Sequence, residues 1–489
     1  PPKSGRFDFS LGRYMLRRLA RRLVGSDVLA VSRMSMRRLS DAMVPESKRV
    51  RTEMPPPSNP RMPDFHRGLF LAPMVRVGSL PSRLLALEYG ADLVWGPEVV
   101  DRAIMGTERR VNAATGEVEF VKDEKQIFSC HPVERPYLIY QVGSSTPENA
   151  AEAVRIVTAQ DDVAGVDLNC GCPKPFSTLG GMGSNLLTMP DLLCDILRAM
   201  RRAAPPHVSV TAKIRMLPTQ EETFALVEQI VRSRTIRALT VHCRTKTMRP
   251  REPALLDRLR AVAEHVARIA AETGQDVPVV CNGDCFGATD VAQITATTGA
   301  TSVMLARGPE ANPSCFGVSR VCAATEIAPK WLRYAVYFDN PFGNTKYCMT
   351  QLAFTTTAGA KEIDAPRVSP LFRRELVDMR AMLSQSKSHE DIARALGLSW
   401  PLELGDVLGG VRRALEQRTM TAYDRALQEA QRIEADAPRP ATADAGCAAP
   451  TKSLDGEVAP LFEGTAENMP RAGGARSNGG DVPPSDMGS

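Results

Sequence analysis

The stretch Val166-Asp-Leu-Asn-Cys-Gly-Cys-Pro-Lys174 is the starting point for interpreting the chain. Gly165 to Leu168 is short, apolar and β-branched at Val166, which predicts a buried strand. The chain then turns through Cys-Gly-Cys-Pro, and glycines at 180, 181 and 183 precede an apolar helical pattern. A strand that ends in thiols beside a glycine-rich surface is typical of an α/β active site, and the alternative is a tight turn with two buried cysteines.

Short apolar runs alternate with helical patterns on both sides of this stretch. The expected strands cover 69–72, 91–95, 136–142, 165–168, 208–214, 238–242, 277–281 and 302–306. Between them lie helical patterns such as 147–159, with Thr146 as N-cap and Pro147 at the first helical position. Eight such units over about 250 residues predict one (β/α)8 barrel. The segment 100–128 is too long for a simple crossover and predicts a small insertion.

Polar side chains stand where several of these strands end, and a (β/α)8 barrel carries its chemistry there. They are Gln141, Asn169, Cys172, Lys213, His242, Asn282 and Arg307. Lys213 suits an anionic cofactor ring, or is a solvated strand end. His242 is a site residue or a hydrogen-bonded core histidine. Asn282-Gly-Asp284 with Arg307 suits a phosphate monoester, or is simply a turn.

Outside the barrel the composition changes, and we divide the chain into four parts. These are a basic extension (1–63), the barrel (64–318), an all-helical domain (319–434) and a disordered tail (435–489). The expected later helices are 331–337, 344–354, 371–383, 390–398 and 411–433, with Ser388 as a cap. The Arg-rich, acid-poor extension is a transit peptide, a basic arm for nucleic acid, or an over-extended gene model.

Charge and cysteine usage restrict the setting in which the chain works. A net charge of +5 in 489 residues permits an anionic partner without requiring one. The cysteine count is odd, at 11, and no secretory signal is visible, so we expect a reducing compartment and no disulfide framework. No metal site and no membrane span are expected. We expect a cytoplasmic monomer, or a mitochondrial one if the extension is a transit peptide.

Motifs along residues 68–355, taken in order, resemble those of the dihydrouridine synthase family. They are Leu71–Gly78, Asp167–Pro173, Gly180–Gly183, Thr211–Arg215, Val241–Arg244, Asn282–Asp284, Arg333–Val336 and Asn344–Cys348. The segments Leu71–Leu87, Lys174–Met182 and Asn344–Cys348 are most similar to the eukaryotic class that modifies position 20 of tRNA.

The resemblance implies an FMN-dependent reductase of uridine in tRNA, with NADPH as reductant, hydride transfer to C6 and a proton from Cys172 to C5. The implied flavin site comprises Pro73, Met74, Val75, Gln141, Lys213, His242, Asn282, Gly283, Asp284, Ala306 and Arg307. The residues implied for the substrate are Asn169, Lys174, Arg215 and Arg244. Two residues depart from the family pattern: Cys170 stands where Met is common, and Asp284 where Gly is common.

Two other functions compete with this interpretation. One is an FMN barrel oxidoreductase that acts on a free pyrimidine or a related small molecule. The other is an RNA-binding scaffold without catalysis, against which the presence of Cys172, Lys213 and His242 argues. Residues 366–489 show no pattern of a double-stranded-RNA-binding domain, so tRNA affinity is expected from the two core domains.

Overall fold

The computed structural model describes residues 62–318, 322, 324–352 and 380–436. Nearly all of the expected basic extension (1–63), nearly all of the expected tail (435–489) and most of the expected helix at 371–383 lie outside the described residues. The described part forms one compact unit.

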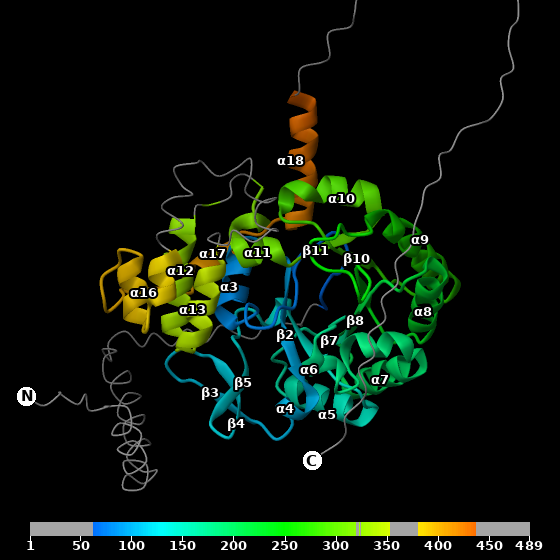
Figure 1. Cartoon of the computed structure of the whole chain (residues 1–489), viewed down its shortest axis with the longest axis horizontal. Helices are drawn as coiled ribbons and strands as arrows, with labels where there is room; N and C mark the ends of the chain where they lie inside the picture. Colours follow the sequence, from blue (N-terminus) through cyan, green and yellow to red (C-terminus); the bar gives the residue numbers. More distant parts are fainter. Residues whose placement is uncertain (1–61, 319–321, 323, 353–379, 437–489) are drawn as a thin grey trace, which may run out of the picture. The chain divides into compact units, whose positions relative to one another are not determined.

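Eight parallel strands close into a barrel, which confirms the predicted fold (Figure 1). In spatial order they are β1 (Leu69–Leu71), β11 (Ser302–Leu305), β10 (Val279–Asn282), β9 (Ala238–His242), β8 (Ser209–Arg215), β7 (Gly165–Cys170), β6 (Leu138–Gly143) and β2 (Leu93–Val100). The helices outside them are α3 (Leu80–Glu88), α5 (Pro147–Thr158), α7 (Pro190–Ala203), α8 (Gln220–Arg232), α9 (Leu256–Glu272) and α10 (Val291–Thr298). The predicted cap of α5 is confirmed, because Thr146 Oγ1 accepts a hydrogen bond from the Asn149 amide.

Successive side chains of each strand point alternately into and out of the barrel. The outward residues pack against the surrounding helices as one large apolar core. A second apolar cluster is built from inward-facing strand residues and Phe65, with Phe70, Trp95 and Met304 among its members. This cluster fills part of the barrel interior, while inward-facing polar residues such as Lys213 and His242 stand toward the carboxyl ends of their strands.

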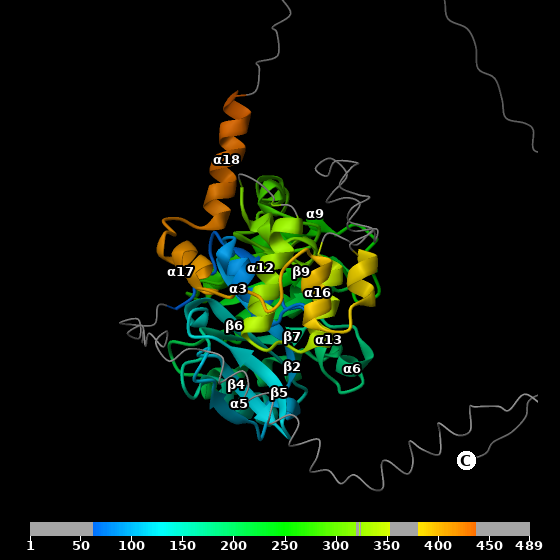
Figure 2. The ribbon, with the colours of Figure 1, turned by 90° about the vertical axis from the view of Figure 1, so that its left-hand side faces the viewer.

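The insertion expected at 100–128 is a separate small sheet. It consists of α4 (Asp101–Ile104) and the antiparallel strands β3 (Glu108–Val111), β4 (Val118–Lys122) and β5 (Lys125–Cys130). The sheet lies outside the barrel (Figure 2) and is joined to it by Phe128, whose ring is 4.9 Å from that of Tyr140 on β6.

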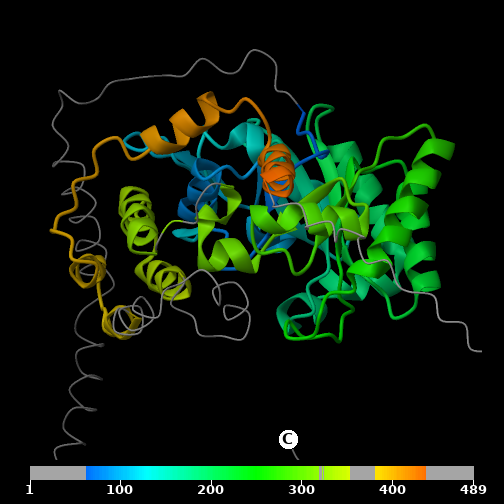
Figure 3. The ribbon, with the colours of Figure 1, turned by 90° about the horizontal axis from the view of Figure 1, so that it is seen from above.

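The later segment is helical, as predicted. Its described helices are α12 (Ala324–Tyr337), α13 (Phe342–Gln351), α16 (His389–Ala395), α17 (Gly409–Glu416) and α18 (Ala422–Asp436). Figure 3 shows α12 beside α3, where Lys330 Nζ lies 2.7 Å from Glu88 and Tyr334 donates to the same carboxylate. Ser388 caps α16 as expected, through the Asp391 amide. No described helix is both long and apolar enough to cross a bilayer.

The single helix predicted over 411–433 is wrong, because the segment forms α17 and α18 with a break between them. The reason is a contact with the barrel that is distant in sequence. Asp92, just before β2, accepts hydrogen bonds of 3.0 Å from the Ala422 amide and of 2.8 Å from the Leu69 amide. The chain therefore starts a new helix at Ala422, where Thr421 also caps the Asp424 amide.

A fully buried ion pair ties α3 to the segment that enters β6. Arg83 and Glu134 are 1% and 0% exposed, and two nitrogens of the guanidinium lie 2.7 and 2.9 Å from the two carboxylate oxygens. Arg83 also donates to the carbonyls of Gly78 and Ser129. The pair therefore joins the loop after β1, helix α3 and the end of β5.

We predict that Glu134→Gln lowers the free energy of unfolding by about 3–5 kcal/mol, because it leaves the Arg83 charge buried without a counterion. Urea denaturation measures the effect. The matched control is Glu152→Gln, which breaks the exposed pair with Arg155 and is expected to cost less than about 1 kcal/mol. Equal costs for the two variants would contradict the prediction.

Candidate functional site

A buried carboxylate organises the inner face of three neighbouring strands. Asp167 on β7 is 0% exposed, and it accepts hydrogen bonds from Gln141 Nε2 on β6 (2.8 Å) and Thr211 Oγ1 on β8 (2.6 Å). Burial raises the pKa of Asp167 to about 6, against the effect of these two hydrogen bonds and of Lys213. Both oxygens are thus engaged, and the network fixes which residues of β6, β7 and β8 face the barrel mouth.

A cationic cavity of about 170 Å³ opens at the carboxyl ends of β8 to β11. Its lining includes Arg215, His242, Arg244, Asn282, Gly283, Asp284, Ala306 and Arg307. Three arginines face one carboxylate, so the lining carries net positive charge. Such a cavity attracts an anion, and it brings together eight of the residues that the sequence singled out.

Asp284 holds two of these arginines in place. It pairs with Arg307 and lies 2.5 and 2.8 Å from Arg244 Nη2, and it accepts a hydrogen bond of 2.6 Å from the Ala254 amide. Burial raises the pKa of Asp284, but the hydrogen bonds from Arg244 and Ala254 and the two positive charges outweigh it and lower the pKa overall. The arginines are therefore fixed before any ligand arrives.

His242 lines this cavity and Lys213 lies on the neighbouring strand β8. Neither side chain has a hydrogen-bond partner among the described residues. Burial, and then the charge of Arg215, lower the pKa of Lys213 to about 8. Burial and the charge of Lys213 push the pKa of His242 well below its usual value, so the imidazole is neutral. Both groups are available to a bound molecule, one as a cation and one as a neutral hydrogen-bonding ring.

The two thiols of the opening motif have different environments. Cys170 is fully buried and belongs to the apolar layer between barrel and helices, because strand alternation turns it outward with Leu168. Cys172 lies beyond the strand in a turn held by Asn169, whose Oδ1 accepts from the amides of Gly171 and Cys172. Burial, and then the charge of Glu98, raise the pKa of Cys172 to about 11. Cys172 is therefore a protonated thiol at neutral pH.

The residues expected to hold the substrate lie in unequal settings. Arg215 bridges two loops, donating to the carbonyls of Gly171 (2.6 Å) and Thr245 (3.0 Å). Arg244 is only 4% exposed and is engaged by Asp284, so the geometry gives it a part in shaping the cavity. Lys174 is exposed at the start of the short helix α6 (Pro175–Thr178). Their roles toward a substrate stay predictions.

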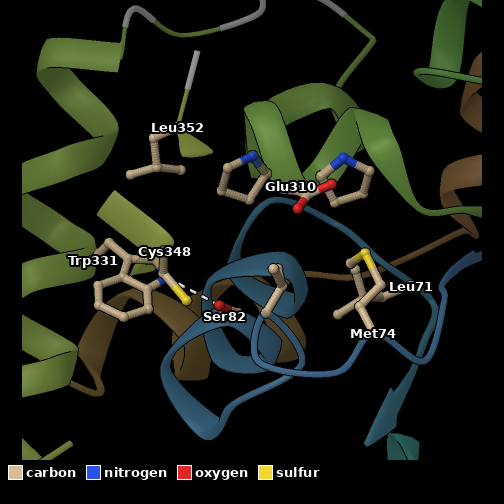
Figure 4. A pocket seen from close by; sticks show the side chains of 10 residues that line it. Leu71, Met74, Ser82, Glu310, Trp331, Cys348 and Leu352 are labelled. Atoms are coloured by element: carbon tan, nitrogen blue, oxygen red, sulfur yellow. Dashed lines mark hydrogen bonds between the residues drawn. The ribbon is translucent and has the colours of Figure 1, made fainter. Parts of the chain in front are cut away.

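The loop after β1 lines a crevice other than the cationic cavity. Met74 lines a crevice of about 10 Å³ together with Leu71, Glu310 of α11 (Arg307–Ala311) and Trp331 of α12 (Figure 4). Trp331 donates to Ser82 across this crevice, at 3.0 Å. Pro73 is partly exposed and Val75 is 51% exposed. Of Pro73, Met74 and Val75, only Met74 lines this crevice, and none of them lines the cationic cavity.

Two acidic residues of the site were missed from the sequence. Asp167 belongs to the opening motif, and its place between Val166 and Leu168 in an alternating strand is the signal for an inward carboxylate. Glu98 was missed because β2 was expected to end at Trp95, whereas the strand continues to Val100 past an irregularity between Trp95 and Glu98.

We predict that the free energy of unfolding of the ligand-free protein rises between about pH 8 and pH 10. The rise should exceed that of Lys213→Met over the same range by about 2 kcal/mol. The folded protein loses the Lys213 proton near pH 8 while the unfolded chain keeps it to about pH 10.5, so the unfolded state binds more protons in this window. Urea denaturation at both pH values checks this. Lys125→Met, at an exposed lysine, should follow the wild type, and parallel curves for all three proteins would refute the prediction.

Comparison with known proteins assigns the chain to a family. The model of the dihydrouridine synthase (Dus) family matches residues 70–389. A tRNA-dihydrouridine(20) synthase [NAD(P)+] of Schizosaccharomyces pombe is 41% identical over 344 residues, which are 69% of this chain and 66% of that protein. The protein of the same name from Saccharomyces cerevisiae is 36% identical, over 58% of this chain and 76% of its own length.

A relative with a different position in its name is less similar. The tRNA-dihydrouridine(20a/20b) synthase of Saccharomyces cerevisiae is 30% identical over 64% of this chain and 80% of that protein. The match to the fission-yeast relative spans just under two thirds of that relative's length. The family model spans more than half of this chain, from β1 through the barrel, α12 and α13 to the first residue of α16. The chain therefore belongs to the dihydrouridine synthase family.

Proposed function

We propose that this protein reduces uridine at position 20 of tRNA to 5,6-dihydrouridine, with FMN as bound flavin and NADPH as reductant. The observation that carries the proposal is a protonated thiol, Cys172, next to a cationic cavity in the mouth of the barrel. Position 20 is favoured because the two relatives with that position in their names are 41% and 36% identical, against 30% for the 20a/20b relative.

The residues at the mouth fit a flavin mononucleotide. Its phosphate suits the cavity lined by Asn282 and Arg307, where positive charge is in excess. Its ring becomes anionic on reduction, which suits Lys213, whose ammonium has no acceptor among the described residues. When bound and reduced by NADPH, the flavin supplies the hydride that adds to C6 of the uracil. Gln141 and His242 would contact the polar edge of the ring, and the loop Pro73–Val75 its apolar side.

Cys172 supplies the proton that completes the reduction. Addition of hydride at C6 builds negative charge on C5 and O4 of the base, and a positioned acid removes it. A thiol with a pKa near 11 keeps its proton throughout the physiological range. Asn169 holds the turn that carries Cys172, and Arg215 joins the same turn to the cavity. The position of the thiol relative to the proposed flavin site is therefore fixed.

The segment after Cys172 suits a folded RNA. A uridine in tRNA is stacked, so the enzyme must move it out of the stack before it can react. Lys174 can pair with a phosphate, while Phe176 and Leu179 are 49% and 87% exposed and offer apolar surface to bases. Exposed apolar residues beside an acid are unnecessary for a free pyrimidine, and they favour the RNA substrate.

We predict that Cys172→Ala retains flavin and is reduced by NADPH as fast as the wild type, but loses at least about 100-fold in reoxidation by tRNA. Stopped-flow flavin absorbance separates the two half-reactions. The matched control is Cys170→Ala, two residues away and outside the barrel mouth, which is expected to reoxidise like the wild type. Normal reoxidation of Cys172→Ala would remove that thiol from the mechanism.

We further predict that NADPH consumption by the purified protein depends on tRNA, falls steeply as salt rises, and does not occur with uridine. Mapping of dihydrouridine in tRNA from cells that lack the protein should show loss at position 20 alone. Consumption with uridine would favour a free-pyrimidine reductase, and an unchanged position 20 would refute the substrate assignment.

A further inference from the structure

The carboxylate of Glu98 reaches from β2 to the turn that carries Cys172. Between Trp95 and Glu98 the register of β2 against β6 shifts, and Glu98 then pairs with Gln141 at the carboxyl end of the barrel. From there Glu98 Oε1 accepts a hydrogen bond of 3.1 Å from Ser177 Oγ on α6, five residues after Cys172. The shift in β2 thus brings a carboxylate past the intervening strand β6 to the segment that follows Cys172.

Two glycines clear the space for this arrangement. A Cβ on residue 143 would lie 2.7 Å from Glu98 Oε1 and would displace the carboxylate. A Cβ on residue 183 would lie 2.4 Å from Ser177 Oγ and 2.6 Å from the Cys172 carbonyl oxygen. The chain therefore lacks side chains at the two positions where they would separate Glu98, Ser177 and Cys172.

Glu98 has an unused oxygen at this point. Its Oε2 atom is buried and has no geometric hydrogen-bond partner among the described residues, although a buried carboxylate oxygen normally has one. The Ser177 hydroxyl that donates to Glu98 lies beside Cys172, since both border the space at Gly183. Glu98 and Cys172 also shift each other's pKa. Burial raises the pKa of Glu98, and the interactions with Cys172 and Ser177 partly offset that rise.

The positive charges near the cavity make it harder for Cys172 to act as a proton donor. The charged side chains that act on the Cys172 thiol are Lys213 and Arg215 from β8 and Glu98 from β2. Cationic neighbours stabilise a thiolate, and cysteines beside Lys or Arg ionise well below their ordinary pKa. A thiolate cannot donate a proton, so these cations work against Cys172 as an acid. Burial first, and the charge of Glu98 second, act in the opposite direction and raise the pKa of the thiol.

We propose that Glu98 is a positioning residue that keeps Cys172 in its protonated, proton-donating form beside the cationic cavity. The proposal rests on the proposed function for its meaning, because it explains how one barrel mouth holds both an anion site and an acid. The proposal itself concerns only the ionisation of the Cys172 thiol, so it can be tested without tRNA.

The test measures alkylation of Cys172 by iodoacetamide between about pH 7 and pH 10 in the full chain with its flavin bound. Peptide mass spectrometry assigns the label, with Cys172→Ala as the blank. Since only the thiolate reacts, the wild-type rate should still be rising at the upper end of this range. In Glu98→Gln the midpoint should fall by about one unit or more, which makes alkylation about tenfold faster near pH 8.5.

Two matched variants distinguish the effect of the Glu98 charge from a general disturbance of the structure. Glu310→Gln removes another partly buried glutamate, in the crevice beside Met74, and should leave the Cys172 profile unchanged. Glu98→Asp keeps the charge and should stay closer to the wild type than Glu98→Gln does. An unchanged profile in Glu98→Gln overturns the proposal. So does a wild-type midpoint at or below the ordinary value of about 8.5, which needs no folded variant.

The effect of Glu98 on the reaction with tRNA is measured separately. In Glu98→Gln the alkaline limb of flavin reoxidation by tRNA should move to lower pH by the same amount as the alkylation midpoint, with reoxidation near neutral pH retained. A shifted alkylation profile in a protein whose wild type does not act on tRNA would uphold Glu98 and reject the proposed function. If the enzyme is active and Glu98→Gln shifts the alkylation profile but not the alkaline limb of flavin reoxidation, Glu98 is rejected as the residue that keeps Cys172 protonated.

Discussion

The buried carboxylate of Asp167 is the constraint on which the site depends. A carboxylate with 0% exposure is tolerated only if both its oxygens are satisfied, and here Gln141 and Thr211 satisfy them from the two adjacent strands. A slip of one residue between β6, β7 and β8 would break both hydrogen bonds and turn the inward residues outward. The same register places Asn169 opposite Lys213, and so places the Cys172 turn next to the cations.

Most of the barrel could be predicted from the sequence, because its signals are local. All eight strands were expected where they occur, since buried parallel strands are short apolar runs bounded by turn residues. The features that could not be predicted depend on contacts distant in sequence. The end of the long helix expected at 411–433 is set by Asp92, and the extension of β2 past Gly96 and Pro97 follows from pairing with β6. Neither partner is visible in the local pattern.

The site could be predicted to a similar degree, and the prediction of individual residue roles failed for a similar reason. Strand-end polar residues such as His242, Asn282 and Arg307 do line one cavity, because parallel strands bring their carboxyl ends together. Residue type and position say less about what a side chain binds. Arg244 was expected to bind the substrate, and the structure buries it against Asp284. Glu98 lay beyond the expected end of its strand. The second thiol, Cys170, is explained by alternation alone.

The contacts of Asp284 give a physical reason for an acidic residue at this position. Its backbone has a φ of 47°, a left-handed conformation that Asp adopts at lower cost than most residues. From this position its carboxylate contacts both Arg244 and Arg307, and the Phe286 ring lies 4.6 Å beneath the Arg307 guanidinium. One positive charge is neutralised, but the remaining cations are held rigidly. Binding of a phosphate then requires little reorganisation, and a preorganised site with less net charge can bind as well as a looser one with more.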